Sequence, residues 1–382
     1  MNESSPIVAI LGIGTAVPAY RLDQADTAKR LAEGLADHPD SARWSKRIFK
    51  QCGVDTRYTC EPNLLESADR CRYYPGRSAE DVPSTAERMA VYKRESVPLG
   101  LKAAKQALAD GQVDRSDITH LITVSCTGQF LPGMDAALVR ELGLSVTVNR
   151  IPLTFLGCAA GLKAVGLAQQ IVADHPSGCV LIVCVELCTL HIQPSATREA
   201  LFGASFFGDG ASACVVGVAG EGRRGLFQLS RPYSALLPGG AEEMVWEVGN
   251  NGFDLYLSTG IPKLIGQFIA EPLAPFVAGG KPELWAIHPG GKGIIDTMED
   301  LFGLTQEQTR ACRAVLRDYG NMSSATILFV LEDMRRELAS RGSGPVGGVA
   351  LAFGPGLSCE LVGIEYVPSV PLQAQARDEA YV

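Results

Sequence analysis

The 382-residue chain has no long apolar run, no excess of positive charge and no nucleotide-phosphate loop. No segment reaches the roughly 18 apolar residues of a membrane span, so we expect no integral membrane segment. With 34 basic against 42 acidic residues, the formal net charge is −8, which argues against a nucleic-acid partner because phosphate binding needs a basic surface. The GxxxxGK loop that cradles phosphates is also absent.

Cysteine and histidine occur without the spacing of disulfide or metal motifs. The eleven cysteines include no Cys-x-x-Cys pair, and the first residues carry no secretory leader pattern. We therefore expect a reducing compartment, the cytoplasm, with unpaired thiols. The five histidines lack the spacing of metal ligands, so we expect no metal site.

Apolar residues and glycine are abundant: the chain is 46% hydrophobic and has 41 glycines. Such a chain can bury a large core, which predicts two merged halves and not a string of modules. Residues 207–217 align without a gap on residues 353–363, and each copy combines a glycine turn with an apolar strand. The repeat predicts a duplicated α/β unit whose two sheets share a core. We place the halves at residues 1–222 and 223–382.

Cys158 is the first candidate for a catalytic residue. Residues 146–156 are rich in β-branched and apolar side chains, which predicts a strand, and residues 159–172 have the spacing of a buried helix. Cys158 would then lie at a helix N-terminus, where unpaired N–H groups and the helix dipole favour the thiolate. The alternative is a buried structural cysteine, which is the commoner role.

His288 and Asn321 complete a possible catalytic set. His288 ends a short apolar run just before Pro289-Gly290-Gly291, where a strand would deliver its side chain into a cleft. Asn321 follows Gly320 and precedes an apolar helical stretch; by itself it would be read as an N-cap. With Cys158, these residues supply a nucleophile, a base that can also donate a hydrogen bond, and a neutral amide donor. The set predicts a thiolate–imidazolium pair that needs no carboxylate.

These segments resemble the type III polyketide synthases, the chalcone synthase-like branch of the thiolase superfamily. The matching segments extend over nearly the whole chain and are residues 10–18, Leu131-Pro132-Gly133, residues 207–211, residues 288–291, residues 320–325 and residues 353–357. The resemblance implies the five-layered αβαβα thiolase fold and an acyltransferase of the bacterial type. It also implies acyl-CoA and malonyl-CoA as substrates, no cofactor, and a homodimer in which Leu131 contributes to the partner's cavity. The peptide bond before Pro132 is a candidate for the cis form.

The resemblance implies a mechanism for the three residues. Cys158 attacks an acyl-CoA thioester and holds the starter acyl group while CoA leaves. His288 stabilises the thiolate and then joins Asn321 in donating hydrogen bonds to the thioester oxygen of malonyl-CoA. Loss of CO2 forms an enolate, which attacks the Cys158 thioester. Repetition extends a polyketide that cyclises to a pyrone or a resorcinol.

The resemblance also implies a set of cavity residues. Phe207 corresponds to a gating phenylalanine, and Leu255 to a second gating aromatic of many plant members, although Phe253 lies close enough to contest that alignment. The other positions are Cys126, Thr127, Cys188, His191, Trp246 and Ser323. Phe207 is equally consistent with core packing, and for His191 a structural role is favoured over cavity lining. Cys188 and Leu255 favour a fatty or medium-chain acyl starter with alkylpyrone or alkylresorcinol products, whereas Trp246 opposes it by filling volume.

A basic cluster lies where the family binds the CoA phosphates, and a solvated helix face is the alternative explanation. The cluster comprises Arg43, Lys46, Arg47, Lys50 and Arg57, and we assign CoA binding to Lys46, Arg47, Lys50 and Arg57. Two other functions remain open. One is a β-ketoacyl-acyl-carrier-protein synthase III-like condensing enzyme, which takes its extender from a carrier protein; the other is a non-catalytic scaffold. Residues 320–324 and 353–357 favour the polyketide synthase.

Overall fold

The computed structural model describes residues 6–76, 78, 80–220 and 225–368. The strands are β1 (Val8–Ala16), β2 (Tyr20–Asp23), β3 (Thr56–Thr59), β4 (His120–Ser125), β5 (Asn149–Thr154), β6 (Val180–Leu187), β7 (Asp209–Val218), β8 (Phe227–Leu236), β9 (Met244–Gly249), β10 (Gly252–Leu257), β11 (Leu284–Ile287), β12 (Val346–Gly354) and β13 (Ser358–Tyr366). The helices are α1 (Gln24–Gly34), α2 (Pro39–Gln51), α3 (Thr85–Asp110), α4 (Met134–Leu142), α5 (Ala160–Asp174), α6 (Arg198–Phe206), α7 (Ile261–Phe268), α8 (Ala270–Val277), α9 (Lys292–Phe302), α10 (Arg310–Tyr319) and α11 (Thr326–Ser340).

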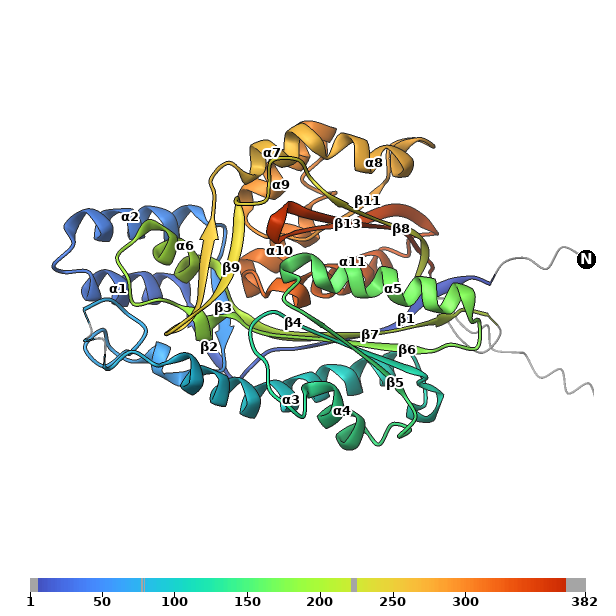
Figure 1. Cartoon of the computed structure of the whole chain (residues 1–382). Coiled ribbons are helices and arrows are strands. Elements are labelled where there is room, and N and C mark those ends of the chain that lie inside the picture. The colour runs from blue at the N-terminus through green and yellow to red at the C-terminus, as the bar shows by residue number, and fades with distance from the viewer. Residues whose placement is uncertain (1–5, 77, 79, 221–224, 369–382) are drawn as a thin grey trace, which may run out of the picture.

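Five layers are stacked in the molecule (Figure 1). The helices α5 and α11 lie in the middle, between one β-layer that contains β4, β6 and β7 and a second that contains β8, β11 and β13. The helices α3 and α4 cover the outer face of the first layer, and α7, α8 and α9 lie over the second. This arrangement confirms the predicted αβαβα thiolase fold. A side lobe of α1, α2 and α6, with the small β2–β3 sheet, packs at one end.

The strand order shows the duplication. The nine strands are ordered β11-β12-β13-β8-β1-β7-β6-β4-β5, so that β8, β13, β12 and β11 mirror β1, β7, β6 and β4 about the β1–β8 junction. The parallel pairs β4–β6 and β11–β12 occupy equivalent positions. Two separate sheets were predicted, but the junction pairs Ala9 with Gln228 and Ile10 with Phe227, which joins them into one hydrogen-bonded sheet. The predicted boundary between residues 222 and 223 lies outside the described residues.

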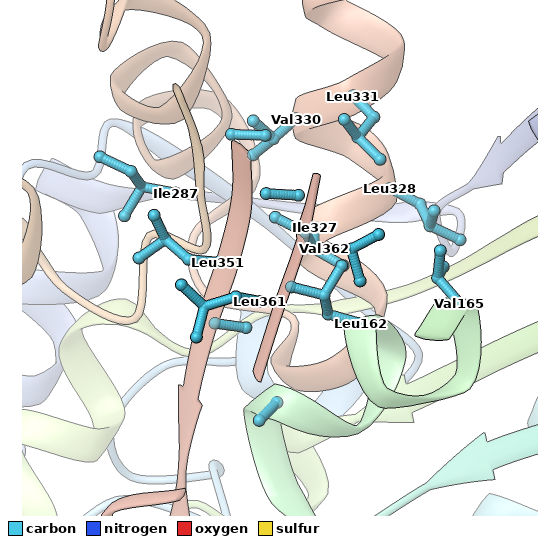
Figure 2. Close-up of a cluster of buried hydrophobic side chains, with 14 of the residues drawn as sticks. Leu162, Val165, Ile287, Ile327, Leu328, Val330, Leu331, Leu351, Leu361 and Val362 are labelled. Atoms are coloured by element: carbon cyan, nitrogen blue, oxygen red, sulfur yellow. The ribbon is translucent and has the colours of Figure 1, made fainter. Parts of the chain in front are cut away.

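Apolar packing between the layers sets the position of the central helices (Figure 2). Leu162 and Val165 of α5 and Ile327 and Leu328 of α11 belong to one buried cluster that also includes Leu361 and its neighbours in the second β-layer. Fully burying such a side chain stabilises the fold by about 1.5–3 kcal/mol. The helices also approach closely at Gly161, where an added Cβ would lie 2.1 Å from the Ser324 carbonyl oxygen. The N-terminal ends of both helices are therefore held side by side.

Candidate active site

The three candidate catalytic residues lie at the ends of core elements. Cys158 sits in a 3-10 turn, Gly157–Ala159, that leads directly into α5. Asn321 lies between the end of α10 and a second 3-10 turn, Ser323–Ala325, that leads into α11. His288 follows the last residue of β11 and donates its backbone N–H to the Leu351 carbonyl at 2.8 Å. The two turns contact each other because α5 and α11 are neighbours.

Asn321 connects Cys158 with the loop that carries His288. Its Nδ2 and Oδ1 both lie 3.9 Å from the Cys158 Sγ. Its Oδ1 accepts a hydrogen bond from the Ser323 backbone N–H at 2.8 Å, and its Nδ2 donates to the Gly290 carbonyl at 3.2 Å. These two bonds orient the amide. Gly290 in turn donates its N–H to the His288 carbonyl at 2.9 Å, so all three segments meet at Asn321.

Burial acts on the two titratable groups in opposite directions. It raises the pKa of the Cys158 thiol to about 11, although hydrogen bonds with Ser323 and Asn321 act to lower it. It lowers the pKa of the His288 imidazole to about 3. The position at a helix start therefore does not by itself make Cys158 a thiolate, contrary to our expectation, because loss of solvation outweighs it. Neither ring nitrogen of the fully buried His288 has a hydrogen-bond partner among the described residues.

An apolar cavity of about 310 Å³ opens beside Cys158 and Asn321. Its wall includes most of the predicted cavity residues, namely Cys126, Thr127, Cys188, Phe207, Trp246, Leu255 and Ser323. A second cavity, of about 240 Å³, shares Cys188, Phe207, Trp246 and Leu255 with the first and is also lined by His191. Leu255 lines both cavities, whereas Phe253 lies behind the wall and is buried. Leu131 lines neither cavity: it is 92% exposed, and its bond to Pro132 is cis, as expected.

Three rings pack against one another at the cavity wall: Trp246 lines both cavities, His191 lines the second, and Phe253 supports them from behind. Trp246 donates its Nε1–H to the Cys126 carbonyl at 2.8 Å and meets His191 edge-on at a centroid distance of 5.5 Å. His191 stacks on Phe253 at 4.2 Å and accepts the Phe253 backbone N–H at Nδ1, at 3.0 Å. Its Nε2 lies 2.7 Å from the Thr127 carbonyl, so that nitrogen carries the proton. Burial lowers the His191 pKa to about 3, so the ring is neutral and holds the wall together.

Glu186 is a site residue that the sequence reasoning missed. Its carboxyl group is fully buried near the end of β6 and accepts hydrogen bonds from the Thr127 hydroxyl at 2.7 Å, the Cys126 backbone N–H and the Ser324 hydroxyl. Burial raises its pKa. The Cys126 thiol also lies 3.0 Å from the Ser323 hydroxyl, which joins the network to the cavity wall. An acidic residue that ends an otherwise apolar strand was the available signal.

The predicted basic cluster divides into two parts. Lys46, Arg47 and Lys50 are exposed on α2. Lys50 lines an open depression together with Lys292, the first residue of α9. This depression adjoins the main cavity, because both are bordered by Gln51, Lys292 and Gly293. Arg57 is wrongly assigned to this cluster: it is fully buried on β3 and donates Nη1–H to the Phe207 carbonyl at 2.7 Å. Alternate residues of β3 point inward, and Arg57 is one of them.

In the described part of the chain, no group of three or more His, Cys, Asp or Glu side chains is arranged to hold a metal ion. None of the described helices has both the length and the apolar character needed to cross a bilayer.

Comparison with known proteins gives consistent matches over most of the chain. Residues 2–220 match the N-terminal domain of the chalcone and stilbene synthases, and residues 228–368 match the C-terminal domain. The alpha-pyrone synthesis polyketide synthase-like proteins Pks18 of Mycobacterium tuberculosis and Mycobacterium bovis are 32% identical over 362 residues, 93% of this chain and 90% of theirs. The C-terminal type III polyketide synthase domain of Steely1 from Dictyostelium superposes with a TM-score of 0.86 at 28% identity, covering 94% of this chain and 99% of that one. The PKS-I structure from the brown alga Ectocarpus siliculosus gives 0.87 at 27% identity, covering 96% and 100%.

Proposed function

Because the chain belongs to the chalcone and stilbene synthase family, the type III polyketide synthases, we propose that it extends a fatty or medium-chain acyl starter held on Cys158 and releases a pyrone or resorcinol-type product. As a member of this family it is an acyltransferase that catalyses decarboxylative condensation, and the family uses acyl-CoA and malonyl-CoA. The starter, the product and the roles of single residues are our proposal. The observation that carries it is the 3.9 Å approach of the Asn321 Nδ2 to the Cys158 Sγ beside an apolar cavity.

Loading requires a base, because burial keeps the Cys158 thiol protonated. His288 is a neutral imidazole whose ring nitrogens have no hydrogen-bond partner among the described residues, so one of them is available to take the thiol proton. The resulting thiolate attacks the thioester carbonyl of acyl-CoA. The C–S bond to CoA then breaks, and the CoA sulfur recovers the proton from His288. The acyl group remains on Cys158.

Extension uses the same histidine as a hydrogen-bond donor. The Asn321 Nδ2–H and one N–H of His288 donate to the thioester oxygen of malonyl-CoA, on which negative charge develops as CO2 leaves. The buried location strengthens both bonds because water is excluded. The enolate carbon then attacks the Cys158 thioester and returns the thiolate, which takes up a proton. The lengthened chain, now on CoA, can be transferred back to Cys158.

The cavity wall supports an aliphatic starter. Cys188 and Leu255 border both cavities and leave room where an aromatic side chain would close the space. Each buried CH2 group of a starter adds about 0.8 kcal/mol of binding on an apolar wall. The Pks18 relatives are named for alpha-pyrone synthesis, which favours a lactone over a carbocyclic product. Trp246 limits the first cavity on one side and sets the length that fits without movement of the wall.

We propose that Lys50 and Lys292 at the cavity mouth contact the CoA phosphates, with Lys46 and Arg47 farther along α2. Ammonium groups at an open mouth can follow a flexible phosphate chain without being buried. The two CoA thioesters supply all the reacting groups, so we propose no cofactor. We also propose a cytoplasmic homodimer, in which the exposed Leu131 enters the partner's cavity.

The deciding experiment is mass spectrometry of products from malonyl-CoA and a series of acyl-CoA starters, with Cys158→Ala beside the unchanged protein. We expect pyrone or resorcinol products with C8 to C16 starters that vanish in Cys158→Ala. Cys214→Ala is the matched control, because Cys214 is buried on β7 away from both cavities and should leave the products unchanged. Aromatic starters used at least tenfold better than C8 to C16 starters would contradict the proposed starter, and a strict need for a carrier protein would favour the ketoacyl synthase III-like alternative.

A further inference from the structure

Arg57 is a buried cation with almost no hydrogen bonds. Its side chain is fully buried, and neither Nε nor Nη2 has a hydrogen-bond partner among the described residues. Burial lowers its pKa to about 10, which still leaves it charged at neutral pH. Asp209 acts on it electrostatically, but the Asp209 carboxylate is hydrogen-bonded to Cys60 and Thr189. Burying a charge this way costs stability, so the position needs another explanation.

Among the described residues, the one hydrogen bond of the Arg57 side chain leads to Asn321 through a single peptide group. Nη1 donates to the Phe207 carbonyl at 2.7 Å, and the N–H of the same peptide group, on Gly208, donates to the Asn321 carbonyl at 3.0 Å. A cation on the oxygen of a peptide group polarises it and makes its N–H a stronger donor. The charge of Arg57 therefore strengthens the bond that holds the Asn321 backbone.

The aliphatic stem of Arg57 packs between the two chain segments that this peptide group joins. A Cβ added to Gly320 would lie 2.9 Å from the Arg57 Cγ, and one added to Gly208 would lie 3.4 Å from the Arg57 Cβ. Asn321 also donates its backbone N–H to the Phe206 carbonyl at 2.8 Å. Neighbours of Arg57 anchor β3 to the same region, since the Thr56 hydroxyl donates to the Asp318 carbonyl at 2.7 Å and Cys60 N–H donates to Asp209 at 2.8 Å.

We propose that Arg57 is a positioning residue for the decarboxylation step: through the Phe207–Gly208 peptide group it holds Asn321 where its amide can stabilise the enolate. Arg57 lines neither cavity and does not touch the substrate. The inference rests on the proposed role of Asn321. Cys158 lies on a different segment, the turn before α5, and its only link to Arg57 is the long 3.9 Å contact with the Asn321 amide among the described residues, so its acylation should depend on Arg57 much less than decarboxylation does. Loss of the Arg57 charge should therefore separate the two half-reactions.

The test measures both half-reactions in Arg57→Met, which keeps the stem and removes the charge. Acylation of Cys158 is followed by mass spectrometry of the intact protein with acyl-CoA alone. The rate of CO2 release from malonyl-CoA is divided by the amount of protein that can be acylated. We expect acylation within about twofold of the unchanged protein and CO2 release slower by about 10- to 100-fold, because small displacements of a positioned donor have effects of this size. The KM for malonyl-CoA should change less than kcat. Arg57→Lys, which restores a charge on a shorter stem, should be intermediate.

Arg88→Met is the matched control. Arg88 is also fully buried, with an unpartnered Nη2 among the described residues, but it donates to the carbonyls of Pro83, Leu190 and Ile192 and contacts neither Phe207 nor Asn321. We expect its ratio of CO2 release to acylation to match the unchanged protein. If the two rates fall together in Arg57→Met, or if only its melting temperature falls, the positioning role is overturned.

Folding failure does not leave the idea untested. If Arg57→Met does not fold, Arg57→Gln is measured in its place with the same expectation. If neither variant folds, Arg57→Lys decides, and a rate of CO2 release within twofold of the unchanged protein overturns the proposal. The unchanged protein separates this inference from the proposed function. Failure of that protein to acylate or to release CO2 would contradict the function, whereas normal activity in both it and the Arg57 variants would contradict only the inference.

Discussion

The half-buried thiol of Cys158 and the buried imidazole of His288 each resist carrying a charge alone, since loss of solvation moves their pKa values to about 11 and about 3. Proton transfer from sulfur to nitrogen creates two opposite charges at once and leaves the net charge of the pair unchanged. Their mutual attraction in a site of low dielectric then offsets part of the lost solvation. Under the mechanism that we propose, the reactive thiolate is for this reason a property of the pair.

A prediction at the residue scale follows for His288→Ala. Without the imidazole, no neighbouring base can take the Cys158 proton, and loss of solvation keeps the pKa of this thiol raised, so very little thiolate is present at pH 7. We expect the rate of Cys158 alkylation by iodoacetamide at pH 7 to fall at least about tenfold and to approach the rate of the unchanged protein as the pH rises toward 11. Peptide mass spectrometry measures the rate, with the exposed His175→Ala as control. Equal rates at pH 7 would show that His288 is not the base.

At the scale of elements, the site depends on how closely α5 and α11 approach. A 3-10 turn leads into each helix. The turn before α5 contains Cys158, and the turn before α11 follows Asn321. The approach is possible because Gly161 has no Cβ: an added Cβ would lie 2.1 Å from the Ser324 carbonyl oxygen, which belongs to the backbone and cannot move aside cheaply. The spacing of the two helices thus controls the distance between nucleophile and amide.

Gly161→Ala should therefore impair the enzyme by two routes. We expect overpacking to reduce the free energy of unfolding by about 1–3 kcal/mol, and the displaced turns to lower kcat more than KM. Denaturant unfolding and steady-state kinetics measure the two effects. Gly266→Ala on α7 is the control, because its added Cβ would meet only Thr297 at 3.4 Å, and it should be neutral or slightly stabilising. Unchanged kcat in Gly161→Ala would contradict the argument.

At the scale of the whole molecule, the duplicated sheet brings residues from both halves to one end of the central helices. Cys158 comes from the first copy, and His288 and Asn321 come from the second. The same burial that shapes the site also makes the fold sensitive to acid, since His191 and His288 are neutral in the folded protein with pKa values of about 3, whereas an unfolded histidine titrates near 6.5.

Stability should fall as the pH drops below 6.5. At pH values between the folded and unfolded pKa of a histidine, only the unfolded chain binds the proton. Each of the two histidines therefore lowers the free energy of unfolding by ~2 kcal/mol between pH 7 and pH 5. Burial raises the pKa of Asp209 to about 6, so the folded protein binds this proton more readily than the unfolded chain does. Asp209 therefore offsets ~1 kcal/mol of that loss in the free energy of unfolding. Thermal unfolding against pH measures the sum. His288→Gln should flatten the profile, whereas the exposed His175→Gln should not; a profile that His288→Gln leaves unchanged would contradict the assignment.

Much of this organisation could be predicted from local sequence. The apolar stretch of residues 146–156 contains β5, and residues 159–172 lie almost entirely within α5, because side-chain periodicity reflects which face of an element is buried. The repeat at residues 207–217 and 353–363 predicted the duplication that β7 and β13 show. The position of Cys158 just before a helix and of His288 just after a strand also followed from the sequence.

The sequence alone determined the family, the elements and the residues that could carry the chemistry, because motif and periodicity are properties of neighbouring residues. Only the tertiary structure decided that Arg57 points inward, that Glu186 joins Cys126 to Ser324, and that the two sheets meet at β1 and β8. It also decided the protonation of Cys158 and His288. Burial is the physical reason, since solvent exposure and hydrogen-bond partners depend on segments that lie far apart in the sequence, and no local pattern records them.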